Sequence, residues 1–138
     1  MPLVLLDRDG VINEDSPAYI KCPSEWLPIP GSLEAISRLN RVGNRVAICT
    51  NQSGLARGLF TIEDLDAIHD AMRRALGGVG GHIDAIFYCP HAPEARCSCR
   101  KPEPGLLVRA MHELQARAMG IDQIFDDLAG AADWLANR

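Results

Sequence analysis

The chain has 138 residues, of which 47% are hydrophobic and 23% are charged. These values suit one ordinary globular domain and leave little room for two. The formal net charge of −4 excludes an overall basic field that would attract nucleic acid or an anionic membrane surface. No apolar run approaches the ~20 residues that span a bilayer, so we expect neither a nucleic-acid nor a membrane partner.

The start of the chain and its cysteines indicate a compartment. The apolar residues at positions 1–6 meet Asp7 too soon to form the hydrophobic region of a signal peptide, so we expect a cytoplasmic protein. In a reducing cytosol, clustered cysteines indicate metal binding or catalysis rather than disulfides. Cys49 lies in an apolar run and is interpreted as a small buried hydrophobe. The five cysteines are Cys22, Cys49, Cys89, Cys97 and Cys99.

Predicted strands and helices alternate from the N-terminus onward. The continuous apolar run at 3–6 predicts a buried strand. Ser32 can cap a helix that Gly43 ends. Thr61 and Asp64 have the spacing of a capping box at the start of a second helix. The apolar residues of that helix repeat at helical intervals, and they are Ile62, Leu65, Ile68, Met72 and Leu76.

Two further strands are predicted at 45–49 and 85–88, and a loop rich in Cys and His follows the second of them. Residues 102–105 lead into another helix, and a last helix is predicted to begin at Asp126 or Asp127. Strands that alternate with helices predict an α/β fold with a Rossmann-like parallel sheet flanked by helices. Ligands of such sheets bind beyond the carboxyl ends of the strands, where polar clusters follow the first two strands.

The first polar cluster contains Asp7 and Asp9. Two carboxylates at this spacing can bind a divalent cation through hard oxygen ligands. Alternatively, one can act as a nucleophile while the other transfers protons. Taken alone, such a pair is more often a polar turn, so its interpretation depends on the rest of the chain.

Three motifs resemble those of the haloacid-dehalogenase (HAD) superfamily. They occupy residues 7–13, 50–54 and 100–105, they occur in the order typical of the superfamily, and the resemblance spans residues 3 to about 115. The resemblance implies a HAD-like fold without a large cap domain. It also implies a hydrolase that acts on phosphoric monoesters.

The resemblance further implies a role for each motif residue. Asp7 would attack phosphorus and form an aspartyl phosphate, and Asp9 would protonate the leaving oxygen and later activate water. The Thr50 hydroxyl, the Asn51 backbone amide and the Lys101 ammonium would stabilise the negative oxygens of the transferred group. Catalytic Mg²⁺ would bridge Asp7, the Asp9 carbonyl and the phosphate.

The Cys/His-rich loop predicts a second metal site. Its four soft ligands lie within eleven residues, which matches tetrahedral zinc bound by three cysteines and one histidine. Four protein ligands leave no open position for substrate, so the zinc would be structural. It would stiffen the loop just before Arg100 and Lys101. The four ligands are Cys89, His91, Cys97 and Cys99.

A zinc loop before the third motif is similar to two families of the superfamily. These are the D-glycero-D-manno-heptose 1,7-bisphosphate phosphatases of lipopolysaccharide precursor synthesis and the histidinol-phosphate phosphatases. Residues 50–58 and the small size favour the heptose family, and histidinol phosphate is the alternative. Arginine suits a second phosphate because its planar fork binds two oxygens at once. The resemblance implies substrate contacts by Asp15, Ser16, Pro17, Ala18, Thr50, Asn51, Gln52, Ser53, Arg57, Arg100 and Lys101.

The fourth motif of the superfamily, an acidic cluster that completes the magnesium site, is not clearly present. Its candidate is the pair Asp126 and Asp127, with Asp126 as a magnesium ligand. Either this pair is a degenerate fourth motif, or Asp126 caps the final helix and a strand-helix-strand unit of ~30 residues is absent. We favour the second interpretation. We expect one domain over 1–138 with a missing or degenerate segment near 115–126.

Absence of that unit would make a function of another class possible. The chain would then be a catalytically inactive, zinc-stabilised protein that binds phosphates. The presence of both Asp7 and Asp9 argues against this alternative, because binding alone does not need both carboxylates. No heptad repeat for coiled-coil pairing can be read from the chain, so we expect a monomer. We expect its ligand to be a small sugar phosphate.

Overall fold

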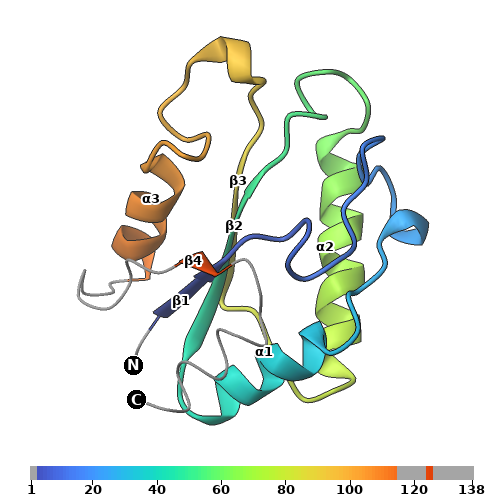
Figure 1. Cartoon of the computed structure of the whole chain (residues 1–138), viewed down its shortest axis with the longest axis vertical. Helices are drawn as coiled ribbons and strands as arrows, with labels where there is room; N and C mark the ends of the chain where they lie inside the picture. Colours follow the sequence, from blue (N-terminus) through green and yellow to red (C-terminus); the bar gives the residue numbers. More distant parts are fainter. Residues whose placement is uncertain (1–2, 115–123, 126–138) are drawn as a thin grey trace.

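The computed structural model describes residues 3–114 and 124–125 (Figure 1). The strands in this part of the chain form one parallel sheet in the order β3-β2-β1-β4. The strands are β1 (Leu3–Leu6), β2 (Arg45–Asn51), β3 (Ala85–Cys89) and β4 (Ile124–Phe125). The helices are α1 (Ser32–Arg41), α2 (Ile62–Gly77) and α3 (Gly105–Glu113), with short 3₁₀ turns η1 (Pro23–Glu25) and η2 (Pro93–Ala95).

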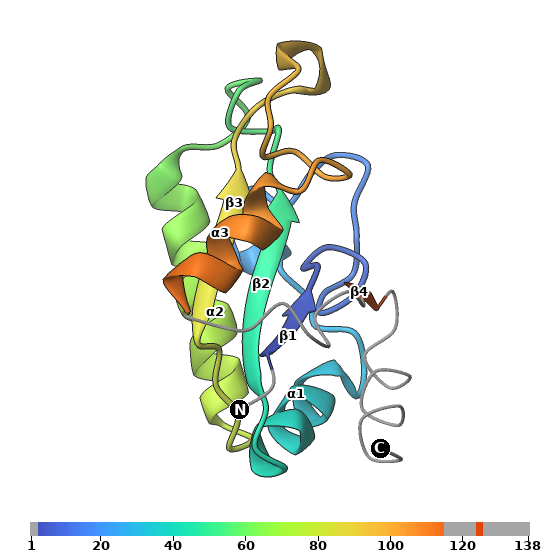
Figure 2. The same ribbon diagram turned by 90° about the vertical axis from the view of Figure 1, so that its left-hand side faces the viewer.

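Helices cover both faces of the sheet, with α2 and α3 on opposite sides (Figures 1 and 2). Successive side chains of a strand point to opposite faces. Val4 and Leu6 of β1 therefore pack into the core on the side of α1 and α2. Leu3 and Leu5 pack instead with Leu106 of α3. Burial on both faces explains the uninterrupted apolar run of β1 and confirms the predicted α/β sheet.

The two helix starts that were predicted from the sequence have different outcomes. The capping box is present, because Thr61 Oγ1 accepts the Asp64 amide at 3.1 Å and Asp64 Oδ2 accepts the Thr61 amide at 2.9 Å. The prediction that Ser32 caps α1 is wrong. Gly31 is the N-cap, with φ of 87°, and Ser32 is the first helical residue. The Ser32 hydroxyl donates to the Ile12 carbonyl at 2.7 Å and joins α1 to the loop after β1.

Two strands extend further than their apolar runs predict. β2 continues past residue 49 and β3 past residue 88, because the parallel register pairs Thr50 with Tyr88 and Asn51 with Cys89. Residues of the second polar cluster thus belong to the sheet itself. The sheet therefore fixes their backbone position.

Strand β4 lies beside β1, with Leu5 paired to Ile124 and Leu6 paired to Phe125. In the sequence, Asp7 directly follows β1 and Asp126 directly follows β4. Asp126, Asp127, the predicted last helix and most of the predicted discontinuity lie outside the described residues. Within the described part of the chain, no helix is both long enough and apolar enough to cross a membrane.

Candidate active site and metal cluster

The first two motifs meet at the carboxyl ends of β1 and β2. Asp7 follows the last residue of β1, and Thr50 and Asn51 end β2. A cavity of about 230 Å³ opens at this edge. Its lining residues are Asp7, Asp9, Asp15, Ser16, Tyr19, Asn51 and Gln52.

Asp7 forms an ion pair with Lys101. The Lys101 ammonium lies 3.0 Å from Asp7 Oδ2, and the Arg8 backbone amide donates to Asp7 Oδ1 at 2.7 Å. The Asp7 side chain is 36% exposed, whereas the Lys101 side chain is 15% exposed. An anionic group that approaches Asp7 from the cavity would therefore meet a carboxylate whose charge a neighbouring ammonium already counters.

The third motif is joined to the second by a pair of hydrogen bonds. The Lys101 amide donates to Asn51 Oδ1 at 2.9 Å, and Asn51 Nδ2 donates back to the Lys101 carbonyl at 3.2 Å. Asn51 belongs to β2 and Lys101 to the loop after β3, so this reciprocal contact attaches the loop to the sheet. It fixes the backbone from which the Lys101 side chain reaches Asp7.

Asp9 is held more extensively than Asp7. Its Oδ1 accepts from Arg8 Nε at 2.9 Å, Arg8 Nη2 at 2.7 Å and Asn13 Nδ2 at 3.0 Å. Its Oδ2 accepts from Gln52 Nε2 at 3.2 Å, and the same amide donates to Thr50 Oγ1 at 2.9 Å. These contacts fix the orientation of the Asp9 carboxylate, and Gln52 links it to the hydroxyl at the end of β2.

Sequence reasoning did not anticipate the surroundings of Arg8. This residue is 0% exposed, and its Nη1 lies 3.1 Å from Nε2 of His69 in α2. His69 is itself buried in the structure. Burial, reinforced by the positive charges of Arg8 and Arg73, lowers the pKa of His69 from 6.5 to about 3. The position of Arg8 between Asp7 and Asp9 in the sequence was the one signal that could have indicated a role for this side chain in the site.

Only part of the predicted substrate segment 15–18 reaches the cavity. Asp15 and Ser16 line it, whereas Pro17 and Ala18 are exposed in the same turn. The Ser16 amide donates to Asp15 Oδ1 at 2.8 Å, and the Ala18 amide donates to Ser16 Oγ at 3.1 Å. Tyr19 also lines the cavity and was not predicted, and its φ of 68° is unusual for a residue with a side chain.

The remaining predicted substrate contacts surround this edge of the sheet. Ser53 is buried within the second motif. Arg57 is exposed and lies 3.9 Å from Glu94 of η2 in the Cys/His loop. Among the described residues, Arg100 has a buried Nη1 without a hydrogen-bond partner. A guanidinium with an unused donor can bind an anionic oxygen.

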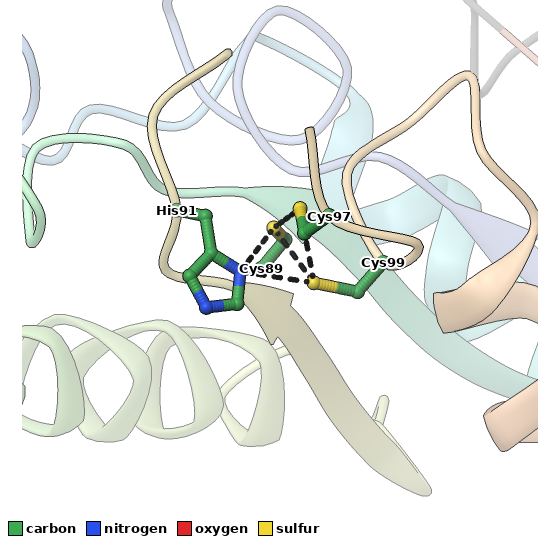
Figure 3. A group of neighbouring side chains, drawn as sticks. All are labelled: Cys89, His91, Cys97 and Cys99. Carbon is green, nitrogen blue, oxygen red and sulfur yellow. Dashed lines mark hydrogen bonds between the residues drawn. The ribbon is translucent and has the colours of Figure 1, made fainter. Parts of the chain in front are cut away.

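The four predicted zinc ligands converge in one cluster (Figure 3). One donor atom from each lies within 4.8 Å of all the others. The closest sulfur pair, Cys89 and Cys99, is 2.9 Å apart, and His91 Nδ1 lies 3.3 Å from Cys99 Sγ. Tetrahedral zinc with Zn–S bonds of about 2.3 Å separates its sulfurs by about 3.8 Å. Small adjustments of this donor set would therefore accommodate zinc, with His91 binding through Nδ1.

The cysteines of the cluster differ in acidity. Burial, assisted by the contact with Cys99, raises the pKa of Cys89 to about 12. The pKa of Cys97 is lowered to about 6, because the Arg100 backbone amide and the neighbouring thiols outweigh the effect of burial. Cys49 lies outside the cluster and is buried as predicted, and burial raises its pKa to about 11. Metal binding would release protons from the thiols that are still protonated.

The class of the protein follows from its fold and the placement of its motifs. A parallel sheet carries two carboxylates after its central strand β1, a hydroxyl at the end of β2, and a lysine on the loop that leads to α3. This arrangement is that of the HAD-like phosphatase class.

Comparison with known proteins identifies the family within this class. No protein-family model matches the chain. It is 49% identical to D-glycero-beta-D-manno-heptose-1,7-bisphosphate 7-phosphatase of Bordetella bronchiseptica, over 98% of this chain and 80% of that protein. It is 53% identical to the equally named protein of Pseudomonas putida, over 82% of this chain and 64% of that protein. The chain thus spans less than two thirds of the Pseudomonas relative.

Structural similarity leads to the same family. The crystal structure of D,D-heptose 1,7-bisphosphate phosphatase from B. bronchiseptica, complexed with magnesium and phosphate, has a TM-score of 0.93. That comparison covers 99% of each chain at 38% identity. The chain belongs to the heptose 1,7-bisphosphate phosphatase family.

Proposed function

We propose that this chain is a magnesium-dependent phosphatase that removes the 7-phosphate of D-glycero-D-manno-heptose 1,7-bisphosphate. The observation that carries the proposal is the pairing of Asp7 with Lys101 beside a firmly held Asp9. Membership of the heptose phosphatase family supports the choice of substrate. The product would be the heptose 1-phosphate.

Asp7 is the nucleophile in this proposal. One of its oxygens attacks phosphorus, a P–O bond to the aspartate forms, and the P–O bond to C7 oxygen breaks. The Lys101 ammonium, 3.0 Å from Asp7 Oδ2, would stabilise the negative oxygens of the transferring group. The Thr50 hydroxyl and the Asn51 backbone amide would assist from the end of β2.

Asp9 acts as the general acid and then as the general base. It protonates the departing C7 oxygen, and its carboxylate then accepts a proton from the water that hydrolyses the aspartyl phosphate. Hydrolysis releases inorganic phosphate and restores the Asp7 carboxylate. The hydrogen bonds from Arg8, Asn13 and Gln52 support this role, because they hold the carboxylate in one orientation.

The donor sets fit two different metals. The Asp7 carboxylate and the Asp9 backbone carbonyl are hard oxygen ligands of the kind that Mg²⁺ prefers, and Asp126 is a proposed further ligand. Bound Mg²⁺ would offset the repulsion between the anionic nucleophile and the anionic substrate. The sulfur-rich cluster fits zinc in a structural role.

The second phosphate of the substrate would be held by arginine. Arg100 supports this role, because its buried Nη1 has no partner among the described residues. Arg57 would contribute a second guanidinium from the loop after β2, and Ser53 and residues 15–18 would contact the sugar. We propose cytoplasmic location for the enzyme.

The decisive experiment compares magnesium-dependent phosphate release from heptose 1,7-bisphosphate and from histidinol phosphate. We expect kcat/KM for the heptose compound to be at least about a hundredfold higher, a difference of about 2.7 kcal/mol in transition-state stabilisation. A preference for histidinol phosphate would retain the mechanism and overturn the substrate. Release from neither compound would favour the inactive phosphate-binding alternative.

A further inference from the structure

Arg8 is a buried cation within the site. A buried charge is costly unless it is paired and hydrogen-bonded. The guanidinium of Arg8 meets this requirement through two partners. Its Nε and Nη2 both donate to Asp9 Oδ1, and its Nη1 lies 3.1 Å from His69 Nε2. The guanidinium therefore connects helix α2 to the Asp9 carboxylate.

The direction of the contact with His69 follows from the chemistry of arginine. A guanidinium carries only N–H donors, so His69 Nε2 must accept and cannot itself be protonated. The imidazole is then neutral, with its hydrogen on Nδ1. The lowered pKa of His69 agrees with this state, because the ring resists protonation at neutral pH. His69 is therefore fitted to accept a hydrogen bond from Arg8.

We propose that His69 is a positioning residue for the phosphatase reaction, because it orients Arg8, which in turn fixes the Asp9 carboxylate. This inference rests on the proposed role of Asp9 as the proton donor. Asp9 Oδ1 accepts three N–H groups, from Arg8 and Asn13, and has no free position for a proton. The transferred proton is then carried by Oδ2, which accepts only from Gln52 among the described residues.

Loss of the His69 acceptor would leave Arg8 Nη1 buried and unpaired. The guanidinium would gain by turning toward other acceptors. A second cavity of about 350 Å³ borders His69, and its other charged lining residues are Asp66, Asp70 and Arg73. Any rotation of the Arg8 guanidinium away from its present position would remove donors from Asp9 Oδ1, and the carboxylate would lose its single orientation. The effect should fall on proton transfer rather than on nucleophilic attack, because Asp7 and Lys101 do not depend on this contact.

Two variants separate the hydrogen bond from the packing of the ring. His69→Leu fills the space without an acceptor, whereas His69→Gln retains an acceptor in Oε1. The substrates are heptose 1,7-bisphosphate, whose alkoxide leaving group needs a proton, and p-nitrophenyl phosphate, whose leaving group departs as a stable anion. The ratio of kcat/KM for the two substrates reports proton donation, because kcat/KM is insensitive to later hydrolysis of the aspartyl phosphate.

For His69→Leu, we expect kcat/KM to fall at least about tenfold on the heptose compound and less than about threefold on p-nitrophenyl phosphate. His69→Gln should restore most of the ratio. Leu76→Ala is the matched control, since this side chain is buried further along α2 and cannot hydrogen-bond to Arg8. The control should lower the free energy of unfolding without changing the ratio.

The possible results distinguish failure of this inference from failure of the proposed function. Equal losses on both substrates in His69→Leu, or no loss, would overturn the positioning role while the phosphatase function stands. A wild-type protein that hydrolyses neither substrate would overturn both. A readout without turnover is the ¹⁵N NMR spectrum of the His69 ring at pH 7. A neutral ring with the proton on Nδ1 supports the inference, and a proton on Nε2 contradicts it.

Discussion

At the scale of single residues, the two carboxylates of the site have different surroundings. Asp7 is partly exposed and faces the Lys101 ammonium, whereas Asp9 accepts from the side chains of Arg8, Asn13 and Gln52. A nucleophile needs an accessible lone pair, and a proton donor needs a fixed direction. The surroundings therefore match the roles proposed for each residue.

The substitution Asp7→Asn tests the nucleophile. We expect turnover to fall by at least about a thousandfold, because an amide oxygen is a poor nucleophile toward phosphorus. Folding should be retained, since Asp7 is partly exposed and its ion pair with Lys101 contributes little to stability at such a position. Phosphate release and a thermal melt measure the two effects. Activity like that of the wild-type protein would refute the mechanism.

The pKa of His69 predicts how stability depends on pH. Because its pKa is about 3 in the folded protein and about 6.5 in an ordinary setting, the unfolded chain binds more protons between these values. The contribution of the neutral His69 ring to the free energy of unfolding is therefore fully present above pH 6.5. It is lost as the pH falls toward 3, by at most about 1.4 kcal/mol per pH unit. Urea unfolding at several pH values should show that the free energy of unfolding falls more steeply with decreasing pH for the wild-type protein than for His69→Gln. Parallel curves would contradict this expectation.

At the scale of elements, the start of α2 depends on reciprocal hydrogen bonds between Thr61 and Asp64. These bonds satisfy amides that have no partner within the helix. We expect Thr61→Ala to lower the free energy of unfolding by about 1 kcal/mol. Thr61→Ser keeps the hydroxyl and should cost much less. Equal losses in the two variants would indicate that the methyl group, rather than the cap, is responsible.

The loop after β3 positions cationic side chains at the site. Its first predicted metal ligand, Cys89, ends the strand, and Cys99 immediately precedes Arg100. The loop also packs closely on the start of α3. A Cβ at Gly105 would lie 2.4 Å from the Ser98 carbonyl oxygen, so only glycine fits there. A metal at the cluster would add a further constraint on the position of Arg100.

Metal analysis tests the cluster. We expect about one equivalent of zinc per chain in the purified protein, and a large loss of zinc in Cys97→Ser, because a serine hydroxyl is a poor zinc ligand. Cys22→Ser is the control. Cys22 lies outside the cluster, so this variant should retain the zinc. Less than about a quarter of an equivalent in the wild-type protein would count against a structural zinc site.

At the scale of the whole molecule, the sheet order explains why distant motifs meet. β1 lies between β2 and β4, so the residues after β1 are flanked by the carboxyl ends of its neighbours. This is the general position for ligands in open α/β sheets. The three motifs are separated by many residues in the chain and become adjacent only in the assembled sheet.

We expect the molecule to be a monomer. Sedimentation equilibrium of the chain should give a mass close to 15.0 kDa at all concentrations used for assays. A mass that doubles with concentration would contradict this expectation.

The sequence by itself determined the local features. Apolar periodicity located β1 and α2, the spacing of Thr61 and Asp64 located a helix start, and the Cys/His spacing located a cluster of side chains that could hold a metal. These patterns were readable because each depends on residues that are close together in the chain. The HAD motifs were readable for the same reason, since each is a short continuous segment of the chain.

Only the tertiary structure decided which motif residues hold one another. The contact between Arg8 and His69 joins residues 61 positions apart, and the contact between Asn51 and Lys101 joins residues 50 positions apart. Ser32 was expected to cap its own helix and instead binds the Ile12 carbonyl. Such contacts depend on strand register and helix packing, which place donors and acceptors to within a few tenths of an ångström. A one-dimensional pattern carries no information at that precision, because the same residues could satisfy their hydrogen bonds locally or with water.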